Sequence, residues 1–249
     1  MRLCLHGNVG IAGSVAVVGT WDPFLTEHRR LAIHLRNVAR RARLTGVAII
    51  LEPAPTSFTW PRREWPVYHA LEARRAFLKS CGVLTTLVVR LRRDETEEGA
   101  AFFVRRVAKR IGLRLLLVGA KQSLGPASKG SHGAIRSACR NNKIRMSVFP
   151  TRARLARLQR QVRYLLAKGD LRRARSLVGS HPILANKQLR NSFWTAADYD
   201  AVLLRPLDTA LESNLLRRIQ LRSGRIYVNG RAKQLAPKAL LAVLARRHR

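Results

Sequence analysis

Strand-like apolar runs alternate with helix-like segments through the first 150 residues, and this order limits the fold more than any other feature of the chain. The apolar runs predict buried strands at 14–19, 47–51, 83–89, 113–118 and 144–149. Segments with the 3.6-residue period of amphipathic helices separate the runs, and glycines stop several of them. The predicted helices span 28–43, 68–81, the acidic patch near 94 through 111, 134–141, 152–167 and 171–177. Such alternation predicts an α/β fold with a doubly wound parallel sheet.

The pattern becomes less regular after residue 180. There we expect a helix after Ala197, a glycine-flanked strand pair around 222–231 and a basic terminal helix over 237–249. The chain is therefore predicted to hold an α/β domain at 12–180 and a small basic α+β extension at 181–249.

The net charge is strongly positive and unevenly spread. Lysine and arginine number 48 against 14 acidic residues, which gives a formal charge of +34. Residues 99–169 contain 17 basic and no acidic residues, so internal ion pairs cannot neutralise this stretch. Phosphate is the natural counter-charge, because each basic side chain on a nucleic-acid backbone releases counterions. A merely solvated basic face is the alternative.

The cysteines and apolar runs exclude several other classes of protein. Cys4, Cys81 and Cys139 are widely spaced with no CxxC pair, so we expect no disulfide partner and no metal site. No apolar window reaches the length of a membrane span, so we expect no membrane partner.

Four segments resemble a known family. Residues 19–28 (GTWDPFLTEH) resemble the G-T/N-F-D-x-x-H/T-x-G-H signature of HIGH-motif nucleotidyltransferases. Residues 51–55 (LEPAP), 118–130 (VGAKQSLGPASKG) and 165–179 (LLAKGDLRRARSLVG) are similar to motifs of the FMN adenylyltransferase, or FAD synthetase, module of bacterial bifunctional riboflavin kinases. The resemblance implies a Rossmann-like fold that binds ATP and FMN. The kinase module's pattern is not found after residue 180.

The resemblance also implies a nucleotide site, of which five residues would remain. They are Gly19, Asp22, His28, Gly119 and Arg163. His28 is the one catalytic remnant, although a helix-start histidine without a role is the alternative that we favour, because a lone histidine rarely acts without its partners. Gly19 and Asp22 also have a structural interpretation as turn and helix-capping residues.

Several departures from the motifs remove groups that the reaction needs. The first His/Thr of the signature is Leu25, and its glycine is Glu27, whose negative charge is unfavourable beside a triphosphate. The histidine of the F-E-P-H-P motif is Ala54. In the V-G-x-D-F-x-F-G loop, the aspartate and both aromatic residues are replaced, by Lys121, Gln122 and Leu124.

A further motif, S-S-T-x-I-R, keeps only its final pair at 162–163. We therefore predict no catalytic residues and no cofactor, and a scaffold that outlived its reaction. The leading hypothesis is a pseudoenzyme that binds structured RNA, expected to be ribosomal, beside other ribonucleoprotein components, in the mitochondrial matrix or the bacterial cytoplasm. The predicted contacts are Arg105, Arg106, Lys109, Arg110, Arg136, Arg140, Lys143, Arg145, Arg152, Arg154, Arg157 and Arg160.

Two other functions stay open. One is an active or residual ATP-dependent, FMN adenylyltransferase-like enzyme with an altered acceptor; only then would ATP and FMN be bound. The other is a flavin- or nucleotide-binding regulator without turnover. Charge alone does not separate RNA from DNA as the partner.

Overall fold

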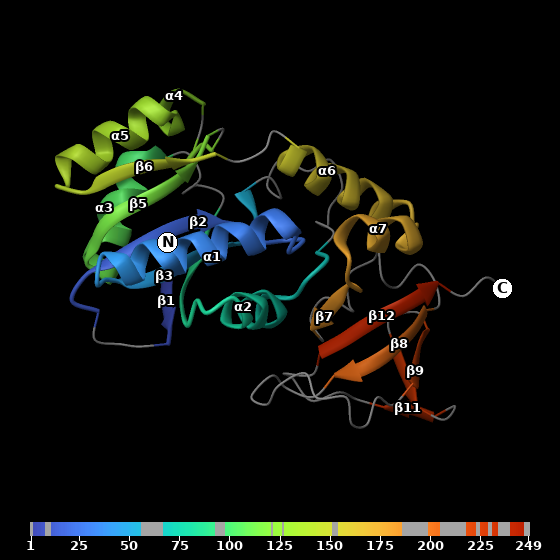
Figure 1. The fold of residues 1–249 in the computed structure, drawn as a ribbon. Coiled ribbons are helices and arrows are strands. Elements are labelled where there is room, and N and C mark those ends of the chain that lie inside the picture. Colours follow the sequence, from blue (N-terminus) through green and yellow to red (C-terminus); the bar gives the residue numbers. More distant parts are fainter. Residues whose placement is uncertain are drawn as a thin grey trace. The chain divides into compact units, whose positions relative to one another are not determined.

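The chain forms two compact units. The computed structural model describes residues 2–7, 11–55, 67–92, 98–120, 122–125, 127–150, 154–185, 199–204, 218–222, 225–228, 231–233 and 240–246. Unit 1 contains Met1–Trp21, Glu27–Thr59 and Phe77–Ala153, and unit 2 contains Asp22–Thr26, Trp60–Ala76 and Arg154–Arg249 (Figure 1). The domain division at residue 180 stays a prediction, because these units divide the chain by packing and group 154–180 with the residues that follow.

Unit 1 is built on a six-stranded sheet. Its strands are β1 (Arg2–His6), β2 (Ser14–Gly19), β3 (Thr45–Glu52), β4 (Thr85–Arg90), β5 (Leu113–Gly119) and β6 (Arg145–Phe149). The order is β1-β4-β3-β2-β5-β6, and only the edge strand β1 is antiparallel, to β4. The doubly wound parallel sheet predicted from the alternation is confirmed. Strand β1, in which polar and apolar residues mix, was not predicted.

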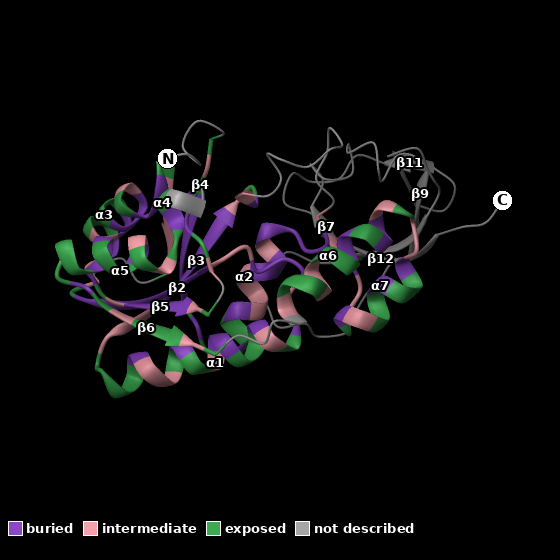
Figure 2. Cartoon of the chain, turned by 90° about the horizontal axis from the view of Figure 1, so that it is seen from above, coloured by how far each residue is buried: buried purple, intermediate pink, exposed green. Residues whose placement is uncertain are grey.

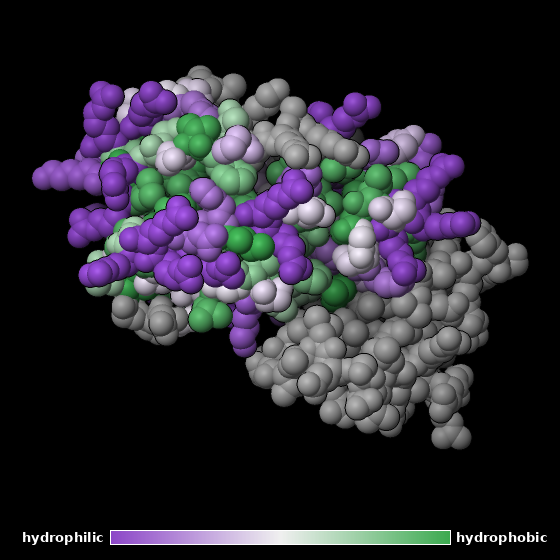
Figure 3. Space-filling model, viewed as in Figure 1, coloured by the Kyte–Doolittle hydropathy of each residue, from purple (hydrophilic) through white to green (hydrophobic). Residues whose placement is uncertain are grey.

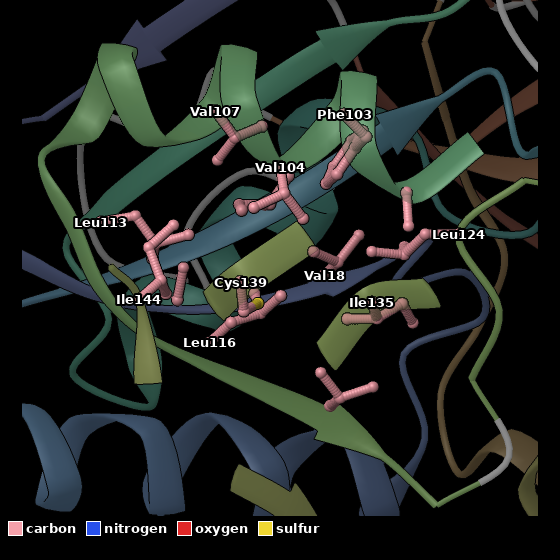
Figure 4. Packing of buried hydrophobic residues seen from close by; sticks show 14 of the residues in the cluster. Val18, Phe103, Val104, Val107, Leu113, Leu116, Leu124, Ile135, Cys139 and Ile144 are labelled. Atoms are coloured by element: carbon pink, nitrogen blue, oxygen red, sulfur yellow. The ribbon is translucent and has the colours of Figure 1, made fainter. Parts of the chain in front are cut away.

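Helices of unit 1 cover both faces of this sheet. They are α1 (Thr26–Arg41), α2 (Leu71–Ser80, which crosses from unit 2), α3 (Gly99–Ile111), α4 (Ala127–Gly130) and α5 (His132–Asn141). On one face, Val18 and Ile49 of the strands pack with Phe103 of α3 and Ile135 of α5 (Figure 4). Helix α1 lies on the opposite face, and α1, α3 and α5 each bury one side and expose the other (Figure 2).

Helix ends in both units follow capping chemistry. Helix α3 begins at Gly99 and ends at Ile111, and the left-handed φ of 54° at the C-cap Gly112 lets its N–H bond to the Ala108 carbonyl. Of the acidic patch expected to open α3 at 94–98, residues 94–97 lie outside the described residues, and Glu98 is the N-cap without a side-chain hydrogen bond. In unit 2, the Asp170 side chain accepts from Arg173 N at 3.0 Å, which makes Asp170 the N-cap of α7 (Leu171–Val178).

Unit 2 pairs two helices with a second sheet. After α6 (Arg154–Ala167) and α7 come β7 (Ile183–Ala185), β8 (Tyr199–Leu204), β9 (Arg218–Arg222), β10 (Arg225–Val228), β11 (Arg231–Lys233) and β12 (Leu240–Arg246). All are antiparallel, in the order β11-β10-β9-β8-β12-β7. The strand pair around 222–231 is confirmed.

Two predictions of helices in this region are wrong. Residues after Ala197 form β8, and the stretch expected as a terminal helix contains β12. The segment LLAVLAR of β12 is rich in leucine and alanine, which favour helices, but β12 pairs with β7 on one side and β8 on the other. Cross-strand pairing decides its structure over intrinsic propensity. The described part of the extension is therefore all-β.

Candidate functional site

Strands β2 and β5 of unit 1 separate at their carboxyl ends. Their pairing stops at Val17↔Leu117, although both continue for two residues, β2 beside β3 and β5 beside β6. From β2 the sheet is extended in one direction by β3 and β4, and the next strand, β5, is then added on the other side of β2. The direction in which strands are added therefore reverses between β2 and β5. In doubly wound sheets, ligands bind in the crevice at this switch point. We call the gap beyond the last β2–β5 pair the β2–β5 crevice.

The side chain of Gln122 crosses the β2–β5 crevice. Its Oε1 accepts from Gly119 N at 3.0 Å, and its Nε2 donates to the Val18 carbonyl at 2.9 Å. On the same strand end, His132 Nε2 lies 2.9 Å from the Gly119 carbonyl, to which it can only donate. The polar backbone groups at this strand end are therefore bonded to the protein itself.

Trp21 occupies the space beside the end of β2. It has a left-handed φ of 56° and is fully buried, with its indole N–H donating to the Ile49 carbonyl at 3.0 Å. A Cβ on Gly19 would lie 3.3 Å from Trp21 Nε1, so the glycine admits this ring. The ring of His28 lies 5.6 Å from that of Trp21, centroid to centroid, and His28 is buried. The catalytic remnant is thus packed among side chains.

Three of the substituted motif positions are apolar and buried. Leu25, at the edge of unit 2, is 2% exposed, and Ala54 and Leu124 of unit 1 are 7% and 6% exposed. Leu124 belongs to the core cluster that includes Val18 and Phe103. None of these three side chains can hydrogen-bond a phosphate, and in unit 1 the Gln122 side chain bridges the β2–β5 crevice. Lys121 lies outside the described residues.

In unit 2, Asp22 and Arg163 are brought together in a buried hub. The Asp22 carboxylate accepts from the backbone N–H groups of Tyr68 at 3.2 Å and His69 at 2.7 Å. Arg163 Nη2 lies 3.7 Å from Asp22 Oδ2 and donates to the Asp22 carbonyl at 2.5 Å. Asp22 precedes α1 by four residues, and its carboxylate fixes the chain at 68–69.

Burial shifts the pKa of three groups in this hub. Burial, aided by the positive charge of Arg74, lowers the pKa of His69 to about 3. Burial raises the pKa of Tyr68 and lowers that of Arg163, the latter against the opposing effect of Asp22. His69 Nδ1 accepts from Phe24 N at 3.0 Å, and Tyr68 Oη donates to the Ser180 carbonyl at 2.5 Å. No local sequence motif predicts that Tyr68 and His69 belong to this hub, because their hydrogen-bond partners lie far away in the sequence.

The predicted RNA contacts with described side chains are all exposed. In unit 1, α3 carries four, α5 carries two, and two more lie just after α5 and at the start of β6; they are Arg105, Arg106, Lys109, Arg110, Arg136, Arg140, Lys143 and Arg145. In unit 2, Arg157 and Arg160 lie on α6. Arg154 begins α6, and Arg152 lies outside the described residues.

The described residues also bear on metal binding and on membrane insertion. No group of three or more histidine, cysteine, aspartate or glutamate side chains could hold a metal ion there. In the same residues, no helix has the length and apolar character needed to cross a membrane.

Comparison with known families supports a nucleotidyltransferase-like kind of protein, which the doubly wound sheet alone does not establish. The model of the FAD synthetase family matches residues 10–157, which is more than half of the chain. The chain therefore belongs to the FAD synthetase family. No curated protein matches the chain. It is similar to a solved structure described as a macrolide-efflux protein from Streptococcus pneumoniae, with a TM-score of 0.61 and 13% identity over 96% of this chain and 88% of that one. At that identity the likeness shows a shared fold alone.

Proposed function

We propose that this chain is a non-catalytic member of the FAD synthetase family that binds structured RNA through unit 1. The observation that carries the proposal is the set of exposed cations on the neighbouring helices α3 and α5. The two helices pack together on one face of the sheet. We call this surface the α3–α5 basic face, made of the exposed side chains Arg105, Arg106, Lys109, Arg110, Arg136 and Arg140.

The physics of the α3–α5 basic face favours a polyanion. No carboxylate occurs anywhere between residues 99 and 169, so internal ion pairs within this stretch cannot neutralise its charge. Figure 3 shows the side of unit 1 on which α1 lies, where hydrophilic side chains stand beside hydrophobic ones. A rigid helix pair presenting cations on successive turns suits the phosphates of a folded RNA, which proteins recognise largely by shape and backbone. Ribosomal RNA in a bacterial or mitochondrial ribonucleoprotein particle is the partner we propose.

Loss of the ATP site supports the non-catalytic part of the proposal. Phosphoryl transfer depends on donors aimed at the developing charge. Here Leu25 and Ala54 are buried and apolar, and Glu27 adds a carboxylate at the start of α1. The retained His28 packs against Trp21. We accordingly propose that neither ATP nor FMN is a cofactor of this chain.

Replacing four cations of α3 with alanine should weaken RNA binding and its salt dependence. For the variant with Arg105, Arg106, Lys109 and Arg110 all changed to alanine, the slope of log K against log salt should fall in magnitude by about three. Affinity for a labelled ribosomal RNA fragment should fall at least about tenfold at moderate salt. Fluorescence anisotropy titrations over a salt series measure both, with a duplex DNA of the same length as competitor.

A matched variant on the opposite face of the sheet tests whether location matters. Arg29, Arg30, Arg40 and Arg41 of α1 are exposed, and changing them to alanine removes the same charge. RNA affinity should then change much less than in the α3 variant. Equal losses in both variants would reduce the effect to net charge, and a parent protein without RNA affinity at low salt would refute the proposal.

Family membership itself favours a second candidate, a residual ATP-dependent adenylyltransferase with an altered acceptor. The matched region, residues 10–157, contains the segment 19–28 that resembles the HIGH-motif signature, and Gly19, His28 and Gly119 remain in unit 1. Pyrophosphate release from ATP in the presence of FMN, absent from His28→Ala, would support this candidate. For the non-catalytic protein we expect no release above background in either form.

A further inference from the structure

We infer that Gln122 is an internal ligand that fills the β2–β5 crevice and keeps it closed to adenine nucleotides. The inference rests on the non-catalytic part of the proposed function and is independent of RNA binding. Its basis is the amide that joins two strand ends across the place where the strands no longer pair.

Two backbone groups at the crevice need partners. Beyond Val17↔Leu117, the Val18 carbonyl and the Gly119 N–H have no partner on the neighbouring strand across the gap. Unbonded polar groups at such a place would each cost free energy unless water or a ligand reached them. The Val18 carbonyl is an acceptor and the Gly119 N–H beside it is a donor. A planar group that carries a donor next to an acceptor can bond to both.

The Gln122 amide and the edge of adenine present the same pair. A primary amide offers an NH₂ donor next to a carbonyl acceptor. Adenine offers its N6 amino group next to a ring-nitrogen acceptor. Gln122 uses Nε2 on Val18 and Oε1 on Gly119, at 2.9 and 3.0 Å, so it makes the two hydrogen bonds that an adenine edge would make there. The family pattern has an aromatic residue at this position, which makes neither bond.

The loop that carries Gln122 is fixed at both ends of the short segment. Gln122 N donates to the Gly119 carbonyl at 2.9 Å, and Leu124 N donates to the Gly130 carbonyl at 3.0 Å. Leu124 is buried in the core, and a Cβ on Gly130 would lie only 2.7 Å from the Gly125 carbonyl oxygen. The amide is therefore held in place, and a nucleotide must displace it before its base can bond to the strand ends.

When a tethered group competes for the site, the apparent affinity for adenosine equals the intrinsic affinity multiplied by the fraction of time for which the site is open. If the amide leaves the crevice about a tenth of the time or less, removing it should tighten adenosine binding about tenfold or more. The test uses the full-length protein and adenosine, which needs no phosphate contacts. Gln122→Ala removes the amide, and Gln122→Asn keeps an amide too short to span both partners. Gln122→Met is the control, because it fills the space without hydrogen-bonding.

The readout is the rise in thermal unfolding temperature with adenosine, together with NMR titration. We expect saturable binding by the alanine and asparagine variants, at least about tenfold tighter than by the parent, and none by the methionine variant. If the alanine variant shows no cooperative unfolding, the adenosine affinity of the asparagine variant is compared with that of the parent instead. Parent-like adenosine affinity in the opened variants, or tight binding by the parent itself, would overturn the inference. RNA affinity measured on the same proteins should not change, so a failed RNA proposal stays distinguishable.

Discussion

Replacing Asp22 with alanine should lower the free energy of unfolding by about 3–5 kcal/mol, because it leaves a buried guanidinium without its carboxylate. Asp22 is 3% exposed and Arg163 is 5% exposed. The same change removes the acceptor of the Tyr68 and His69 N–H groups, which the fold then buries without a partner at that point. Urea unfolding followed by tryptophan fluorescence measures the loss.

Two further variants separate the ion pair from a general effect of losing a charge. Asp170→Asn removes an acidic group from a half-exposed helix cap, and asparagine caps as well as aspartate, so this change should cost little. Asp22→Ala combined with Arg163→Met should cost less than the sum of the two single changes, because the second removes the charge that the first left unpaired. Additive losses would show that Asp22 acts only through the backbone amides.

The sheet of unit 1 was predictable because each of its buried strands is a short apolar run that local pattern reveals. The segment at 14–19 was predicted with the bounds that β2 has. Strand β1 escaped because its residues, RLCLH, mix polar and apolar side chains at a sheet edge. Strands β8 and β12 escaped because pairing with other segments, and not local preference, sets their structure.

The candidate site was predictable only as a set of losses. Motif comparison finds that Leu25 and Ala54 lack polar groups, but it says nothing of what those positions do instead. In the motif comparison, Gln122 is only the loss of an aromatic residue. In the folded chain its side chain bonds to Val18, which lies 104 positions away in the sequence. The hub around Asp22 joins residues 46 and 141 positions away. Such partners become visible only when the chain is folded.

Acid should destabilise the protein through His69, and replacing this one residue should remove much of the effect. His69 is fully buried, and burial lowers its pKa from 6.5 to about 3. Between these two pH values the unfolded chain binds a proton that the folded chain does not. The free energy of unfolding therefore falls as the pH falls through this window, by at most about 1.4 kcal/mol per pH unit.

Urea unfolding at pH 7 and at pH 5 tests this dependence. Most of that interval lies below the unfolded-state pKa, so the His69 contribution should be about 2 kcal/mol smaller at pH 5 than at pH 7. In His69→Gln, glutamine keeps a neutral acceptor near Phe24 N but cannot take up the proton, so the variant should be less stable at pH 7 yet lose less on acidification. His34→Gln removes an exposed imidazole from α1 and should follow the parent's slope. Equal slopes for all three proteins would mean that the hub around Asp22 admits the proton without unfolding.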